Sequence, residues 1–160
     1  MVPIPTKYHP NIAKYLNARV KTLWQAKGNT VSEKGDKALE LFEAGCNCSQ
    51  AVLAAFCEKY DLEPEAAMRM AAAFGGGMRR GEVCGAVTGA LMVLGLRDGA
   101  RKPEEQDRKK EANARTIAFM KAFEERYGSY LCRDLIKAAG KKVCDQVVPG
   151  AAELLVEQGY

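Results

Sequence analysis

Histidine and long apolar runs are what this sequence lacks most clearly. Its 160 residues contain a single histidine, His9, so catalysis by imidazole, a histidine-rich metal site and bis-histidine haem are all poorly supported. No stretch reaches the roughly 18 uninterrupted apolar residues that span a bilayer. We therefore expect a protein without membrane insertion.

The chain also lacks an export signal and a large excess of one charge. The first residues, MVPIPTKYHP, do not have the charged and then apolar layout of a signal peptide, which favours a cytoplasmic location. The formal net charge of +4 is small. Because positive and negative residues alternate in stretches such as RKPEEQDRKK, as they do on solvated surfaces, we expect no nucleic-acid partner.

The residues that are present predict an all-α fold. With 48% hydrophobic and 28% charged residues, the composition is that of one globular domain. Apolar residues recur at three- and four-residue steps, and no segment alternates as a strand does. We expect a single-domain irregular bundle of about seven to eight helices. The predicted helices cover residues 10–27, 33–44, 48–60, 64–74, 81–96, 103–126, 130–139 and 149–158, and in 103–126 the inward side is expected to carry Ala114, Ile117, Ala118 and Phe123.

Six cysteines point to the chemistry of the protein. Reducing pools keep most cytosolic thiols free of structural disulfides, so metal binding or redox chemistry is favoured. Cys57 is set apart from the others because it lies on the opposite side of its predicted helix from Cys48. We expect Cys57 to be a buried core residue.

Four other cysteines lie at or near predicted helix starts or in connections between helices: Cys48, Cys84, Cys132 and Cys144. Unpaired N–H groups and the helix dipole stabilise a thiolate at such positions, so we expect lowered thiol pKa values. Gly85 and Gly89 lie one turn apart in the helix that contains Cys84, where they would let another backbone approach closely. Tight helix packing alone explains these two glycines equally well.

The spacing of the cysteines does not determine which metal they bind, or whether they bind one. No C-x-x-C pair of the zinc-ribbon kind occurs, and Cys46 forms a single C-x-C pair with Cys48. Four thiolates gathered from separate helix ends could hold an iron–sulfur cluster or zinc. Pairs of the same cysteines could instead cycle between dithiol and disulfide, with no cofactor.

Four motif segments follow one another along the chain: NCSQAVLAAF, GGGMRRGEVCGAVTGALMVLGL, SYLCRDLI and KKVCDQVV. Together they resemble the C_GCAxxG_C_C family, a small bacterial and archaeal group to which a helical fold and redox activity are ascribed. The resemblance extends over residues 38–155. Carried over by motif, the four cysteines of the family are Cys48, Cys84, Cys132 and Cys144.

The family is also similar to the non-haem part of split-Soret cytochromes, helical dimers in which a cysteine-bound two-iron cluster accompanies haem. This likeness implies an iron–sulfur cluster of the two-iron type on a helical scaffold that can form a homodimer. No C-x-x-C-H motif is present, so covalent haem is not expected. Cys46 departs from the family pattern, which commonly has an aromatic residue there, and it either replaces or supplements Cys48 as a metal ligand.

These observations divide the chain into two parts. Residues 1–30 form an N-terminal helical extension, outside the resemblance, that is expected to pack on the core and to serve docking or dimer contact. Residues 31–160 form a four-cysteine helical redox domain.

The leading hypothesis is a redox-active protein, an electron carrier or oxidoreductase, whose metal and cofactor ligands are Cys48, Cys84, Cys132 and Cys144. It would pass single electrons through an iron–sulfur centre to a redox partner protein that the sequence does not identify. Arg79, Arg80 and Lys142 either offset the thiolate charge or are plain surface charges. The alternatives are thiol–disulfide exchange, with Cys46 or Cys48 as the attacking thiol, and a structural zinc-binding helical interaction module.

Overall fold

The computed structural model describes residues 32–160 and confirms the all-α fold. The predicted helix at 10–27 and the whole N-terminal extension lie outside these residues. Within 32–160 there is no strand, and one isolated antiparallel bridge joins Val83 to Leu131. The α-helices are α3 (Glu33–Glu43), α4 (Cys48–Ala54), α5 (Pro64–Ala71), α6 (Gly85–Asp98), α7 (Gln106–Tyr127), α8 (Cys132–Ala139) and α9 (Cys144–Glu157), and short helical turns are η2 (Glu58–Tyr60), η3 (Ala72–Phe74), η4 (Gly77–Gly81) and η5 (Lys141–Val143).

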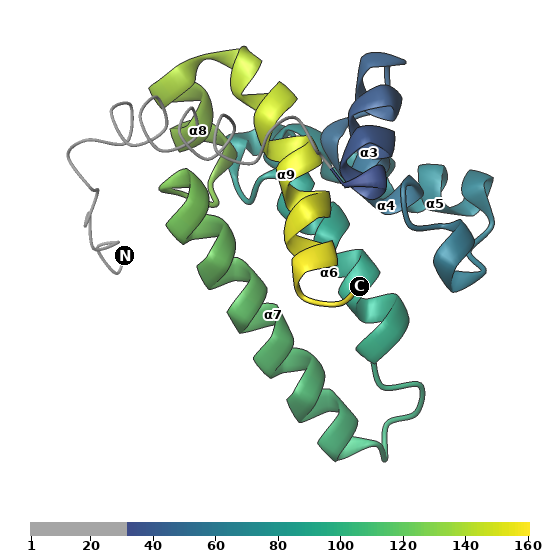
Figure 1. Cartoon of the computed structure of the whole chain (residues 1–160). Coiled ribbons are helices and arrows are strands. Elements are labelled where there is room, and N and C mark those ends of the chain that lie inside the picture. The colour runs from purple at the N-terminus through teal and green to yellow at the C-terminus, as the bar shows by residue number, and fades with distance from the viewer. Residues whose placement is uncertain (1–31) are drawn as a thin grey trace.

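Helix α9 occupies the centre of the bundle. It packs against α3, α4, α6 and α7, while α4 lies along α6 and α6 along α7 (Figure 1). Helices α6 and α7 form a long antiparallel pair that extends away from α8 (Figure 1). Segments far apart in the sequence therefore meet along α9 and between α4 and α6, while α8 packs against η4 and η5.

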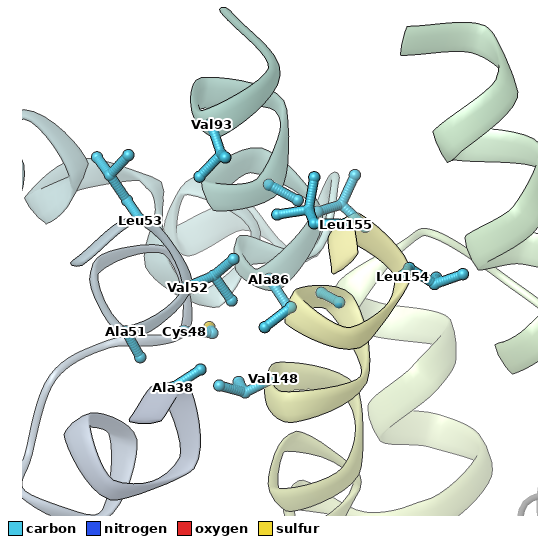
Figure 2. Packing of buried hydrophobic residues seen from close by; sticks show 14 of the residues in the cluster. Ala38, Cys48, Ala51, Val52, Leu53, Ala86, Val93, Val148, Leu154 and Leu155 are labelled. Carbon is cyan, nitrogen blue, oxygen red and sulfur yellow. The ribbon is translucent and has the colours of Figure 1, made fainter. Parts of the chain in front are cut away.

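The core is made of small and aliphatic side chains from these central helices. Val52 on α4, Ala86 on α6 and Val148 on α9 lie together in the cluster that also contains Cys48 (Figure 2). All three are 0% exposed. Small side chains let helix axes approach closely, so van der Waals contact is gained along the whole length of each helix.

Two helix starts differ from the prediction. Helix α6 begins at Gly85 rather than near residue 81, because the preceding glycines form a separate left-handed turn. Helix α9 begins at Cys144 and continues through Pro149, which was expected to mark its start. A proline inside a helix removes one backbone hydrogen bond. Here the buried Tyr127 hydroxyl packs beside Gly150 and donates to the Gln146 carbonyl at 3.4 Å, adding a contact within this turn.

The inward face predicted for α7 is wrong in its first half. Ile117 is 68% exposed, and Ala114 and Ala118 are exposed as well. Phe123 is buried as predicted, and the other buried side chains are Phe119 and Tyr127, one helical turn before and after it. Their rings contact one another in sequence, with centroids 6.4 Å and 4.7 Å apart. Aromatic side chains bury more apolar area than alanine, so they decide which face of α7 meets the core.

No helix in residues 32–160 combines the length and the apolar character needed to cross a bilayer.

Candidate functional site

Four cysteines begin four different helices. Cys48, Cys132 and Cys144 are the first residues of α4, α8 and α9, and Cys84 is the N-cap residue of α6. The predicted placement at or near a helix start is confirmed for Cys48, Cys84 and Cys132, whereas Cys144, which was expected in a connection between helices, begins α9. Cys48, Cys84 and Cys132 are buried, at 7%, 3% and 6% exposure, whereas Cys144 is half-buried.

A short antiparallel bridge brings the first turns of α6 and α8 together. The Cys84 amide donates to the Tyr130 carbonyl at 2.8 Å, and the Cys132 amide donates to the Glu82 carbonyl at 2.7 Å. These two hydrogen bonds flank the Val83–Leu131 pair. Cys84 and Cys132 follow the two bridge residues directly, so the pairing sets their relative position.

The start of α4 is held by a capping box. The Asn47 side chain accepts from the amides of Ser49 and Gln50, and the Gln50 side chain accepts from the Asn47 amide. The Ser49 hydroxyl donates to the Ala71 carbonyl at 2.8 Å. Cys48 lies between these residues and is therefore fixed relative to α5 and η3. The pattern N-C-S-Q carries this capping signal, which sequence reasoning missed.

Glycines leave the space that the cysteines occupy. A Cβ atom on Gly85 would lie 2.7 Å from Cys48 Sγ, and one on Gly77 would lie 2.8 Å from Cys132 Cβ. A Cβ atom on Gly89 would lie 2.6 Å from the Ser49 carbonyl oxygen. Gly89 therefore serves close helix packing, whereas Gly85 makes room for a sulfur atom. The packing interpretation of these glycines thus applies at Gly89, and the interpretation that links them to the cysteines applies at Gly85.

The glycine-rich connection before Cys84 adopts a left-handed turn. Four consecutive residues have positive φ: Gly76 (62°), Gly77 (59°), Met78 (56°) and Arg79 (60°). For residues other than glycine, this conformation costs roughly 1–2 kcal/mol each. The turn is closed by the Glu82 amide, which donates to the Gly77 carbonyl at 3.1 Å.

An ion pair ties the end of this turn to α8. Arg133 Nη1 donates to Glu82 Oε1 at 2.7 Å. A Cβ atom on Gly81 would lie 3.0 Å from Arg133 Cβ, so the two segments are closely packed. This contact supports the strained residues Met78 and Arg79.

Burial, more than helix ends, controls the thiol pKa values. Burial and then the charge of Cys48 raise the pKa of Cys84 to about 12, although the amides of Ala86 and Val87 lower it. Burial, followed by the charges of Cys48 and Cys132, raises the pKa of Cys144 to about 11. Burial also raises the pKa of Cys132. The expected lowering is wrong for these three thiols, because the cost of desolvating a negative sulfur outweighs the helix-end donors.

The same charge effects show which thiols are neighbours. Cys48 and Cys132 each act on the pKa of Cys84 and of Cys144. All of these thiols are free. A tetrahedral zinc site would need sulfur ligands about 2.3 Å from one point, and no three His, Cys, Asp or Glu residues in 32–160 are arranged to hold a metal ion. Cys48 and Cys132 therefore lie within electrostatic range of Cys84 and Cys144, but the thiols of the described residues do not surround a single point.

Cys57 and Cys46 lie in other surroundings. Cys57 is buried, as predicted, and its thiol faces the Leu53 carbonyl within α4 at 3.7 Å. Cys46 is half-buried, and its Sγ lies 3.9 Å from Met68 Sδ on α5.

The cations singled out in the sequence are on the surface. Arg79, Arg80 and Lys142 are all exposed. The cation that lowers the pKa of Cys144 is Lys141, the neighbour of Lys142. The nearest compensating charge thus comes from a residue that sequence reasoning did not select.

Comparison with known proteins connects this arrangement to one family. A family model described as "Putative redox-active protein (C_GCAxxG_C_C)" matches residues 46–158. Comparison with curated proteins gives no match. Comparison with solved structures gives none either.

Proposed function

Because the chain belongs to the C_GCAxxG_C_C family of redox-active proteins, we propose that Cys48, Cys84, Cys132 and Cys144 together form its redox centre. We further propose that they hold an iron–sulfur cluster, of the two-iron type, and that the protein is a one-electron carrier. When bound, such a cluster supplies a one-electron couple whose potential depends on hydrogen bonds and burial. The observation that carries the proposal is the convergence of four cysteine-bearing helix starts.

The donor set fits an iron–sulfur cluster chemically. Four cysteine sulfurs are the usual ligands of a two-iron cluster. The first-turn amides of Ala86 and Val87 in α6 act on the Cys84 sulfur, and such donors stabilise the more negative, reduced form. A two-iron cluster is also larger than a single ion, so its ligands need not surround one point.

The raised pKa values favour metal ligation over nucleophilic chemistry at two of the cysteines. A thiol with a pKa of about 12, as for Cys84, is a thiolate in about one molecule in 10⁵ at neutral pH. Cys84 and Cys144 are therefore poor attacking thiols. A bound metal cation supplies the positive charge that the buried site otherwise lacks, and its binding releases the protons.

The assignment of ligands also favours Cys48 over Cys46. The charge of Cys48 acts on Cys84, Cys132 and Cys144, whereas the Cys46 sulfur packs against Met68. We propose that Cys46 is not a ligand. A cytoplasmic location, a homodimer and a separate redox partner protein remain predictions that follow from the same hypothesis.

The test is metal and sulfide analysis, with an absorption spectrum, on protein purified without oxygen. We expect brown protein that contains iron and acid-labile sulfide. Serine variants of Cys48, Cys84, Cys132 and Cys144 should each lose iron, whereas Cys46→Ser and the matched control Cys57→Ser should retain it. Colourless protein with stoichiometric zinc would establish the structural alternative. Metal-free protein whose free-thiol count falls on oxidation would establish thiol–disulfide exchange.

A further inference from the structure

A cluster of exposed cations lies beside the cysteine-bearing helix starts. It comprises Arg79, Arg80, Lys137, Lys141 and Lys142, all exposed, and we call it the basic rim. These residues come from η4, α8 and η5, and α8 packs against both of the other elements. The basic rim is thus assembled from two segments that are distant in the sequence.

Few carboxylates in the same segments oppose this charge. Residues 77–82 and 130–145 contain Glu82, Asp134 and Asp145. Glu82 is paired with Arg133 at 2.7 Å, and Asp134 is buried. Asp145 is the third carboxylate of these segments, and it is exposed. The basic rim therefore carries a net positive charge, and that charge favours an acidic partner.

The basic rim contains one residue held in a strained conformation, Arg79, and adjoins a second, Met78. Met78 and Arg79 have φ values of 56° and 60°, and Met78 is 38% exposed. The strained turn presents this methionine next to Arg79 and Arg80, while the adjoining Gly77 packs against Cys132. Methionine and arginine are enriched at protein interfaces, and strained residues concentrate at functional sites.

The basic rim also borders the most accessible of the four thiols. Cys144 is half-buried, while the other three are buried. Lys141 and Lys142 lie in η5, and Cys144 follows η5 directly as the first residue of α9. A partner seated on the basic rim would therefore approach the cysteine centre where its protein cover is thinnest.

We propose that the basic rim is the docking surface for a small acidic electron-carrier protein. This inference rests on the proposed function, since a one-electron carrier needs a protein partner. Redox encounters are typically small, below about 1,200 Å² of buried surface, and charge accelerates their formation. A cluster of five exposed cations with an exposed methionine has the chemistry of such a surface.

The experiment measures binding of an acidic two-iron ferredoxin, used as the probe, to the full chain. Binding is followed by amide chemical shifts, on both the metal-free and the iron-loaded protein. The rim variant Lys141→Glu/Lys142→Glu is compared with the control variant Lys102→Glu/Lys109→Glu. The control changes net charge equally, and its lysines are exposed. Lys102 lies in the connection between α6 and α7 and Lys109 in the first turn of α7, and this end of the α6–α7 pair is remote from α8 (Figure 1).

We expect the rim variant to bind the probe about tenfold more weakly than the wild type at low ionic strength, and the control variant to bind within about twofold. The difference should vanish near 0.5 M salt, where charges about 10 Å apart are screened. Shift changes should concentrate at residues 78–80 and 137–145.

Three outcomes would overturn the inference: no binding of the probe at low salt, equal weakening in both variants, or binding of anionic lipid vesicles in preference to the ferredoxin. Loss of the proposed function is separable from these outcomes. If the protein contains no iron but the metal-free form still binds the probe at the basic rim, the redox proposal fails and the docking surface stands.

Discussion

Replacing Gly85 with alanine should disturb the cysteine centre directly, and α6 contains its own control. A Cβ atom on Gly85 would lie 2.7 Å from Cys48 Sγ and 3.2 Å from the Phe74 carbonyl oxygen. A Cβ atom on Gly95, in the same helix, meets nothing within 4 Å. The same substitution therefore tests steric overlap at one position and helix propensity alone at the other.

The magnitudes follow from these contacts. Alanine stabilises a helix over glycine by about 0.5–1 kcal/mol, so Gly95→Ala should raise the free energy of unfolding by that amount. Overpacking a tight site costs about 1–3 kcal/mol. Gly85 is the first residue of α6, where alanine gains less helix propensity than in the interior. Gly85→Ala should therefore be less stable than Gly95→Ala by at least about 1–3 kcal/mol, or roughly 2–10 °C in melting temperature for a chain of this size.

Denaturant unfolding of the metal-free protein, under reducing conditions, measures this difference without involving a cofactor. Iron content is the second measurement, because a displaced Cys48 sulfur should weaken cluster retention in Gly85→Ala and leave Gly95→Ala unaffected. If Gly85→Ala proves as stable as Gly95→Ala and retains as much iron, the close approach of Gly85 to Cys48 is wrong.

Three further predictions concern the supports of the site and the bundle. Asn47→Ala removes the α4 cap and should lower the free energy of unfolding by about 1–2 kcal/mol, measured in denaturant; an unchanged value would show that the cap contributes nothing. Gly150→Ala would drive a Cβ atom into the buried Tyr127 hydroxyl and should destabilise by about 1–3 kcal/mol, with a smaller loss when Tyr127→Phe is also present; equal losses in both backgrounds would rule out this clash. Burial raises the pKa of Asp98, but hydrogen bonds from Arg97 and Tyr160 hold it below its usual value. The stability that Asp98 contributes is thus complete above its unfolded pKa of about 3.9 and is lost as the pH falls below that value. Asp98→Asn should therefore flatten the acid side of a plot of unfolding free energy against pH. An unaltered acid side would contradict the hydrogen bonding of Asp98 with Arg97 and Tyr160.

Local signals in the sequence were sufficient for most of the fold. Ser32 caps α3 by accepting from the Gly35 amide, and Pro64 stands at the first turn of α5, as both residues predict when read alone. These two caps depend on neighbours within a few residues, which a sequence displays directly. Cys57 is also buried as predicted, although α4 ends at Ala54, before this residue.

The features that the sequence did not predict correctly share a different cause. Ile117 is apolar but exposed, because no described helix covers that side of α7, and Pro149 continues a helix that it was expected to begin. The left-handed turn at Met78 and Arg79 has no local preference in its favour. Each of these depends on which distant segment packs alongside, and spacing along the chain does not contain that information.

For the cysteine centre, too, some features follow from the local sequence and others from the tertiary structure. By itself, the sequence placed Cys48, Cys84 and Cys132 at or near helix starts, because capping and helix-start signals are local. It left Cys144 in a connection between helices, although this residue begins α9. Only the tertiary structure brought the start of α8 to that of α6, through the bridge between Val83 and Leu131, and Cys48 to α6, in the space left by Gly85. It also reversed the expected direction of the thiol pKa values, since desolvation depends on every segment that covers a sulfur and helix-end donors act only within one turn.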